Sequence, residues 1–292
     1  MGKMIEIRAT DSNATFSGYL ALPASGKGPG VVIGQEIFGV NANMRAVADF
    51  YAEEGYVALV PDLFWRLQPG VDLGYTEADF AAAIDLFQRL DVDKAITDID
   101  ASFKALRALP EVEGSGLGYV GFCMGGKLAW LTAARTDVSR SDGYYGMGIE
   151  HLLHESENLT GRLVLHFAEN DGYCDANARA RISEHLAGSD KAEIYVYPGV
   201  DHAFARAGGS HYDKPASLMA HERSIAALKR EIGPHFNLSA LWEEHIRHEF
   251  ETRDVPATMA TMVAEPYVNH IPTMTGGVGA RELSRFYQHH FV

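Results

Sequence analysis

The most informative segment of the sequence is Gly121-Phe122-Cys123-Met124-Gly125-Gly126. Residues 116–120, just before it, form an apolar run typical of a buried strand, and residues 127–135 are typical of a helix. A strand, a sharp turn and a helix are the context of a nucleophile elbow, whose glycines permit a strained, closely packed backbone. We therefore predict that Cys123 is a nucleophile, its thiolate favoured by the helix N-terminus. The alternative is a buried cysteine in an ordinary strand–helix turn.

Apolar strands alternate with helices on both sides of this segment. An opening hairpin and four further strands are predicted at 4–8, 16–22, 30–34, 56–61, 162–167 and 192–197. Helices are predicted at 43–54, 77–89, 93–109, 176–186 and 215–232. Continuous apolar strands that alternate with helices indicate a mostly parallel sheet with helices on both faces. We therefore predict an α/β fold for a first domain of residues 1–236.

The remainder of the chain, residues 237–292, has a different character. It is rich in His, Met and Glu and lacks the strand–helix alternation. Helices are predicted at 241–252 and 280–290, and residues 267–271 are predicted to be extended. Roughly fifty residues seldom form a self-sufficient core. We expect a mainly helical appendage that packs on the first domain, mediates self-association or another partner contact, or belongs to a larger unit.

Composition excludes several classes of partner. The formal net charge of −14 argues against nucleic acid and against an anionic membrane surface. The chain has only two cysteines, so no disulfide framework is expected. Neither a signal peptide nor an apolar run long enough to cross a bilayer is evident. These features predict a cytoplasmic protein that acts on a small molecule.

Four chemically suitable residues follow predicted strands. They are Glu36, Cys123, Asp171 and His202. Because active sites in parallel sheets lie beyond the carboxyl ends of the strands, we expect these side chains to meet. The order nucleophile, acid, histidine is that of α/β-hydrolases, which indicates acyl-transfer chemistry without a cofactor.

Other interpretations remain open at several of these positions. Glu169 and Asp201 are alternative acids, although Asp201 adjoins the histidine in sequence and should point elsewhere. Asp171 is also typical of a turn or helix cap, and His202 and Glu36 of ordinary loop residues. A non-catalytic relative that serves as a binding module is the alternative function. The complete set of four residues favours an enzyme, because a retired site should have lost members.

The segments that carry these residues resemble the dienelactone hydrolase (carboxymethylenebutenolidase) family, whose members are α/β-hydrolases with a Cys-Asp-His triad. The resemblance rests on Glu36, Gly121-x-Cys123-x-Gly125-Gly126, Asp171, Asp201-His202-x-Phe204, residues 61–64 and residues 143–146. It implies that Cys123 attacks an ester carbonyl, that His202 handles its proton and that Asp171 holds the imidazole. Glu36 would take the thiol proton when substrate binding shifts its loop.

The resemblance also implies an oxyanion hole and a substrate site. Backbone N–H groups of Ile37 and Met124 would form the oxyanion hole, and Arg206 and Tyr144 would contact the substrate. The family's lactonases hold a substrate carboxylate with two arginines, but the second falls on Ala81 here. Family aromatic positions nearby fall on Asp85 and Gln88, and Arg66 is a candidate replacement for the missing arginine. We therefore expect a small ester or lactone as substrate, with neutral molecules favoured.

The appendage has a resemblance of its own. Residues 242–245, 267–272, 276–279 and 286–287 are similar to the beginning of a SnoaL-like α+β cone, which would be incomplete here. The histidines of His245-x-x-His248-Glu249 and His289-His290 raise the question of a metal site. Histidines on helix surfaces are commoner than metal ligands, so no metal site is expected.

Overall fold

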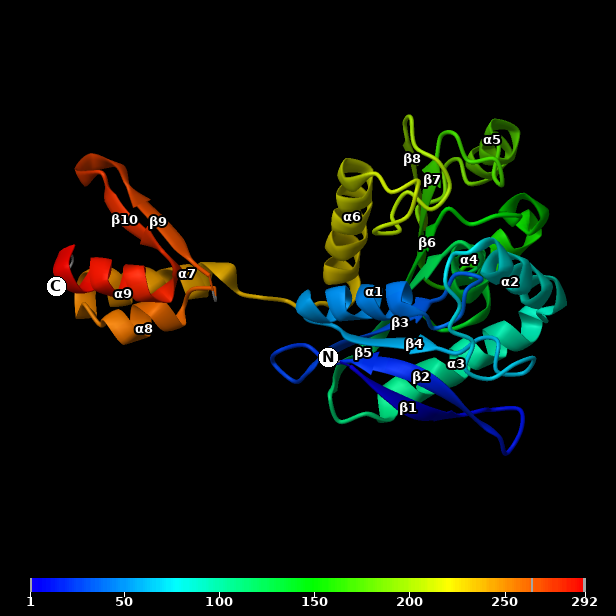
Figure 1. The fold of residues 1–292 in the computed structure, drawn as a ribbon, viewed down its shortest axis with the longest axis horizontal. Coiled ribbons are helices and arrows are strands. Elements are labelled where there is room, and N and C mark those ends of the chain that lie inside the picture. Colours follow the sequence, from blue (N-terminus) through cyan, green and yellow to red (C-terminus); the bar gives the residue numbers. More distant parts are fainter. Residues whose placement is uncertain (1, 264, 291–292) are drawn as a thin grey trace. The chain divides into compact units, whose positions relative to one another are not determined.

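The computed structural model describes residues 2–263 and 265–290. Its contacts divide the chain into two compact units, residues 1–234 and 235–292. The first unit contains one sheet of eight strands, in the order β1-β2-β4-β3-β5-β6-β7-β8 (Figure 1). These strands are β1 Lys3–Arg8, β2 Thr15–Ala21, β3 Gly28–Gly34, β4 Val57–Pro61, β5 Val112–Phe122, β6 Arg140–Tyr144, β7 Arg162–Ala168 and β8 Ala192–Tyr197.

The sheet is parallel from β4 to β8 in its spatial order. Strands β1 and β2 form the predicted hairpin, and β2 pairs antiparallel with β4. The other pairs, from β4–β3 to β7–β8, are parallel. Every residue of β3 and β4 is buried, as expected for strands covered on both faces. The predicted α/β fold with a mostly parallel sheet is confirmed.

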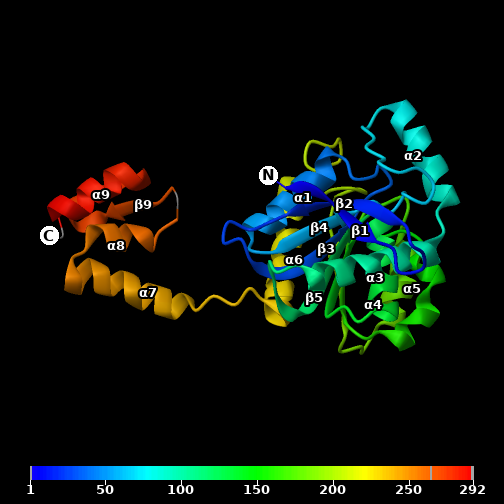
Figure 2. The same ribbon diagram turned by 90° about the horizontal axis from the view of Figure 1, so that it is seen from below.

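Helices cover the two faces of this sheet. They are α1 Ala42–Glu53, α2 Glu77–Arg89, α3 Val92–Ala108, α4 Met124–Arg135, α5 Ala176–His185 and α6 Lys214–Ile232, with short 3-10 helices η1 Ile149–His151 and η2 Leu153–Asn158. The pair α1 and α6 packs on one face, and α3 and α4 pack together on the other (Figure 1 and Figure 2). None of the described helices is long and apolar enough to cross a membrane.

Helix starts are fixed by polar caps that the sequence supplies. The Thr76 side chain accepts from the Asp79 backbone N–H, and the Asp79 carboxylate accepts from the Thr76 backbone N–H, which makes a capping box at the start of α2. At the start of α1, the Asn41 side-chain oxygen accepts from the Met44 backbone N–H, a single N-cap hydrogen bond. One face of helix α2 forms a wall of the pocket that Cys123 lines.

A buried hydrogen-bond network lies between β6, β7 and α6. His166 bonds to the Tyr197 hydroxyl through Nδ1 at 2.9 Å and to Ser224 Oγ through Nε2 at 3.1 Å. The Tyr144 hydroxyl donates to Ser224 Oγ at 2.9 Å, and its oxygen lies 3.5 Å from His221 Nδ1. All five side chains are buried. These polar groups therefore connect α6 to the interior of the sheet.

Acid should destabilise the fold through this network. Burial lowers the pKa of His221 to about 4 and holds that of His166 well below its usual value. The unfolded chain has histidine pKa values near 6.5, so it binds more protons than the folded chain as the pH falls from 6.5 toward 4. Each such histidine should lower the free energy of unfolding by about 1.4 kcal/mol per pH unit in this window. Calorimetric unfolding between pH 7.5 and 5 would measure the slope.

Two other titrating groups bear on this slope. Burial raises the pKa of Asp142 to about 6, which favours the folded state as the pH falls below 6 and offsets part of the loss. The raised pKa of His202, about 10, acts in the opposite direction at the upper end of this range, because it favours the folded state as the pH falls from 7.5 to 6.5 and adds nothing further below that. In His221→Phe the slope above pH 6 should decrease, whereas exposed His151→Ala should leave it unchanged. An unaltered slope in His221→Phe would contradict this account.

The second unit consists of α7 Leu238–Ile246, η3 Arg247–Thr252, α8 Val255–Ala260, β9 Tyr267–His270, η4 Ile271–Thr273, β10 Thr275–Val278 and α9 Gly279–His290. The predicted helices at 241–252 and 280–290 correspond to α7 with η3 and to α9. The extended segment predicted at 267–271 corresponds to β9, which pairs with β10 in a two-stranded hairpin; β10 and this pairing were not predicted. Leu283, Phe286 and Tyr287 form its small core. Its likeness to the start of a SnoaL-like domain stays a prediction.

Candidate active site

A strained turn joins β5 to α4 at Cys123. Its backbone has φ 55° and ψ −109°, a positive-φ conformation that residues other than glycine rarely adopt. The turn also requires its glycines. A Cβ added at Gly121 would lie 2.0 Å from the Gly125 carbonyl oxygen, and one at Gly125 would lie 2.4 Å from the Gly34 carbonyl oxygen. The predicted elbow is therefore present, and strain is concentrated at its cysteine.

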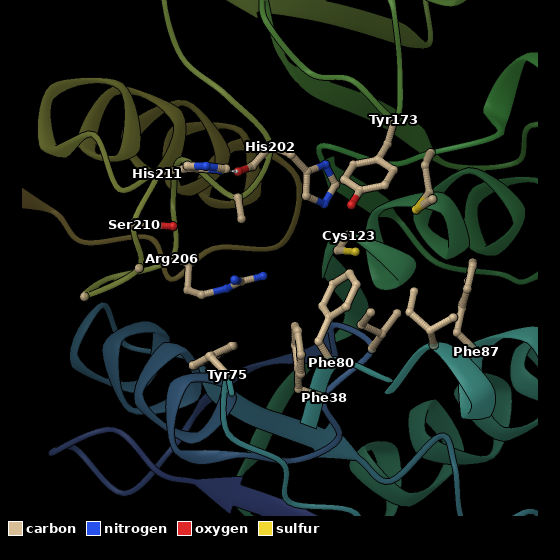
Figure 3. Close-up of a pocket in the computed structure, with 16 residues that line it drawn as sticks. Phe38, Tyr75, Phe80, Phe87, Cys123, Tyr173, His202, Arg206, Ser210 and His211 are labelled. Atoms are coloured by element: carbon tan, nitrogen blue, oxygen red, sulfur yellow. Dashed lines mark hydrogen bonds between the residues drawn. The ribbon is translucent and has the colours of Figure 1, made fainter. Parts of the chain in front are cut away.

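The cysteine faces a pocket of about 420 Å³ (Figure 3). Cys123 and Ile37 both line this pocket. Met124 is the first residue of α4, so its backbone N–H has no acceptor within the helix. Of the two residues predicted to form the oxyanion hole, Ile37 thus lies in the pocket wall and Met124 directly follows Cys123. Backbone N–H groups at such positions are suited to stabilising an oxyanion.

His202 and Asp171 are brought together from two loops. Asp171 follows β7, His202 follows β8, and the Asp171 Oδ2 atom lies 2.8 Å from His202 Nδ1. The other oxygen of Asp171 accepts from the Tyr173 backbone N–H at 2.8 Å. Of the alternative acids, Glu169 accepts from the Gly199 backbone N–H instead, and Asp201 is exposed. The carboxylate that orients the imidazole is therefore that of Asp171.

The pKa of His202 is raised although its imidazole is buried. Burial lowers its pKa, but the hydrogen bonds to Asp171 and Cys123 outweigh burial and raise the pKa to about 10. An imidazolium beside a sulfur stabilises thiolate over thiol. The Tyr145 and Tyr173 rings contact the imidazole edge-on, at centroid distances of 5.0 and 4.9 Å. They restrict its rotation and exclude water from part of its surface.

Glu36 and Arg206 form a bidentate ion pair beside this site. Arg206 donates from Nε to Glu36 Oε2 at 2.9 Å and from Nη2 to Oε1 at 3.0 Å. The Glu36 side chain is only 1% exposed, so the guanidinium is its main compensation for lost hydration. Phe38 and Tyr75 lie against the guanidinium at 5.2 and 4.6 Å from the ring centroids. The expected proton acceptor and the expected substrate arginine are thus paired with each other.

Tyr144, a predicted substrate contact, and Arg66, a candidate replacement for the missing arginine, both lie outside the pocket lining. Tyr144 does not line the pocket, because its side chain points into the buried network under α6 and its hydroxyl donates to Ser224. Arg66 does not replace the missing arginine, because it donates to Asp98 and Asp11 and lies outside the pocket lining.

Helix α2 supplies an aromatic wall of the pocket that was not among the predicted site features. Phe80, Ile84 and Phe87 line the pocket, whereas Ala81, Asp85 and Gln88 are exposed and do not. The signal was present in the sequence, because apolar residues at i, i+4 and i+7 mark one face of a helix. Tyr75, Met147, Tyr173, Ser210 and His211 are further lining residues that the analysis did not single out.

The described residues contain no group of three His, Cys, Asp or Glu side chains that could hold a metal ion. In the second unit, His245 pairs with Glu249 at 3.1 Å and its Nδ1 atom lies 2.6 Å from Thr261 Oγ1. The side chain of His290 lies outside the described residues.

The two cysteines should differ sharply in reactivity. Cys174 is 1% exposed, and burial raises its pKa to about 12, which leaves little thiolate at neutral pH. Cys123 faces the pocket and the imidazole of His202. Limited iodoacetamide treatment followed by peptide mass spectrometry should find Cys123 alkylated first. Faster alkylation of Cys174 would count against the described environment of Cys123.

Comparisons with known proteins agree on one family. The model of the dienelactone hydrolase family matches residues 16–232. A protein from Azospirillum brasilense is 39% identical over 231 residues, which span 78% of this chain and 99% of the relative. A carboxymethylenebutenolidase from Pseudomonas putida is 35% identical over 222 residues, 76% of this chain and 93% of the relative. A dienelactone hydrolase structure from Anabaena variabilis, 14% identical, covers 80% of this chain and 98% of that chain with a TM-score of 0.58, a likeness in fold.

Proposed function

The chain belongs to the dienelactone hydrolase family, and on this premise we propose that it hydrolyses small esters or lactones with Cys123 as nucleophile. The observation that supports this most strongly is the series of contacts from Asp171 to His202 and from His202 to Cys123, the last two of which line one pocket. Asp171 contacts the imidazole at 2.8 Å, and the imidazole interacts with the thiol. This is the nucleophile, base and orienter arrangement of acyl transfer.

The reaction would proceed in two halves. The Cys123 sulfur attacks the carbonyl carbon, and the oxygen becomes an oxyanion held by the N–H groups of Ile37 and Met124. When the carbon–oxygen bond breaks, the leaving alkoxide takes a proton from His202, and a thioester remains on the cysteine. A water molecule then gives a proton to His202 and attacks the thioester carbon. Collapse releases a carboxylic acid and returns the sulfur to the resting state.

The Glu36–Arg206 pair connects substrate charge to this mechanism. A substrate carboxylate that binds Arg206 would compete with Glu36 for the guanidinium. Glu36 would then be a buried carboxylate without its main partner, and such a group gains a proton readily. This is consistent with the role of proton acceptor from Cys123 that the family resemblance implies for Glu36. A neutral substrate leaves the pair intact and relies on the imidazolium to hold the thiolate.

Removal of Arg206 should separate acidic from neutral substrates. In Arg206→Ala the ratio of kcat/KM for a carboxylated ester to that for a neutral ester of the same size should fall about tenfold or more, since a charge-assisted contact is worth about 1.5–3 kcal/mol. The ratio cancels the general damage from leaving Glu36 unpaired. Arg66→Ala, which alters an arginine outside the pocket, is the matched control. An unchanged ratio in Arg206→Ala would remove Arg206 as the anion contact.

The proposal is tested by screening the purified protein against a neutral aryl ester, a neutral lactone and a carboxylated dienelactone. Hydrolysis of the neutral ester or lactone that is lost in Cys123→Ala supports the proposal. If none of the three compounds is hydrolysed, the proposed activity is wrong, and a non-catalytic binding role becomes the better interpretation.

A further inference from the structure

The pocket in front of Cys123 has two unlike ends. At one end, Arg206, Ser210 and His211 present polar groups, and Phe87 lies on the opposite side of Cys123 (Figure 3). Ile84 lines the same pocket one helical turn before Phe87 on α2. A ligand bound at the cysteine therefore meets a charged surface in one direction and a hydrocarbon surface in the other.

The hydrocarbon end is formed by Phe80, Ile84 and Phe87, which share one face of α2, and we name these three residues the apolar arm. None of them can donate or accept a strong hydrogen bond. Among the described residues that line the pocket, Arg206 is the only lysine or arginine, and Glu36 already neutralises it. The apolar arm thus suits an uncharged group that gains free energy by leaving water.

The position of His202 indicates which part of an ester lies in the apolar arm. His202, Arg206 and His211 belong to the segment after β8, and in Figure 3 the His202 ring lies on the side of Cys123 toward His211 and away from Phe87. The leaving oxygen must reach His202 to collect its proton, so the alcohol part faces the polar end. The acyl chain, on the other side of the carbonyl carbon, then extends toward Phe87.

We propose that the apolar arm receives the acyl chain of a neutral ester, so that the preferred substrates carry an acyl group of several carbons. This inference rests on the proposed hydrolase function and specifies its substrate class. A volume of about 420 Å³ is in the range of pockets that enclose ligands much larger than acetate. An anionic acyl group would lose its hydration in the arm without gaining a cation.

A series of p-nitrophenyl esters tests the proposal. For acetate, butyrate and hexanoate, kcat/KM is divided by the uncatalysed hydrolysis rate, which removes the intrinsic reactivity of each ester. A fully buried methylene contributes about fourfold, so hexanoate should exceed acetate at least tenfold. In Ile84→Trp, which fills the arm, and in Phe87→Ala, which removes its end, this ratio should fall toward one. Gln88→Ala, an exposed change on the same helix, should keep the wild-type ratio.

A second measurement does not depend on hydrolysis. Aliphatic aldehydes add to a thiol so that sulfur bonds to the carbonyl carbon and the thiol proton moves to its oxygen, which places the chain where an acyl chain would lie. Hexanal should protect Cys123 from iodoacetamide at a concentration at least tenfold lower than acetaldehyde, and Ile84→Trp should abolish the difference. If no ester is hydrolysed but this difference persists, the hydrolase proposal fails and the apolar arm stands.

Two results would overturn the inference while leaving the hydrolase function intact. One is hydrolysis of all three esters with no dependence on acyl length, together with equal protection by the two aldehydes. The other is a rate that rises with the alcohol chain of alkyl acetates and not with the acyl chain. Circular dichroism and thermal unfolding of each variant would exclude misfolding as the cause of a decreased hexanoate-to-acetate ratio.

Discussion

Cys123→Ala should lower kcat/KM for ester hydrolysis by about 10⁴-fold or more, because the members of a triad act as a unit and removal of the proposed nucleophile would leave only binding and the proposed oxyanion donors. Alanine is smaller than cysteine and occupies the same position in the turn, so the fold should persist. The measurement is steady-state hydrolysis of a p-nitrophenyl ester at several enzyme concentrations, with thermal unfolding in parallel.

The matched control for this variant is Cys174→Ala. Cys174 is buried outside the pocket lining, so its removal should leave hydrolysis near the wild-type level. A double variant of Cys123→Ala with His202→Ala should be no slower than the first alone, since the two residues serve one step. A folded Cys123→Ala protein that keeps more than a few per cent of the wild-type rate would show that another residue attacks the substrate.

Asp171→Asn should be the second most damaging change, with kcat reduced by about 10²- to 10⁴-fold. The amide has nearly the shape of the carboxylate, but it lacks the charge that stabilises the imidazolium and can hold the ring in the wrong tautomer. The pKa of His202 is raised to about 10 by its contacts with Asp171 and Cys123. It should fall once the residue at position 171 is a neutral amide. Titration of the His202 ring protons by NMR would detect this decrease independently of activity.

Glu169→Gln is the control for Asp171→Asn, because it makes the same chemical change two residues away. Glu169 accepts from the Gly199 backbone N–H and does not contact His202 in the structure. Its neutralisation should alter kcat only a few fold. Equal losses in the two variants would indicate that both carboxylates act on the loop as a whole and that Asp171 has no special role.

Much of the site could be predicted because its residues lie directly after the strands of the sheet. Cys123, Asp171 and His202 each follow an apolar strand, and the parallel sheet brings those strand ends to one edge. The strain at Cys123 was also implied by its glycine neighbours. What could not be predicted is the pairing of Glu36 with Arg206. The two are separated by 170 residues, and which acid a cation selects depends on side-chain geometry that periodicity does not encode.

Tyr144 illustrates a failure that strand geometry explains. Side chains alternate between the two faces of a sheet, so Asp142 and Tyr144 of β6 point to the same side, where α6 lies. Tyr145, the next residue, has a positive φ of 38° and contacts the His202 ring. A family motif with two adjacent tyrosines does not reveal which of them the turn directs toward the substrate.

The second strand of the hairpin in the second unit was missed for a different reason. Strand β10 has only four residues, too few to show an alternating pattern, and glycine occupies two of its positions. Gly276 permits the close approach that pairs β10 with β9, since a Cβ there would lie 1.9 Å from the Val268 carbonyl oxygen. Helix α9, with twelve residues, gave a pattern long enough to predict.

The mutual neutralisation of Glu36 and Arg206 has a consequence for how substrates arrive. The binding site offers no net positive potential of its own, while the whole chain carries a formal charge of −14. An acidic molecule therefore approaches against a repulsive field, and ionic strength, by screening that field, should speed its encounter with the enzyme. Uncharged molecules diffuse in at a rate that salt does not alter. The medium around the protein thus discriminates between substrate classes before any of them reaches the cysteine.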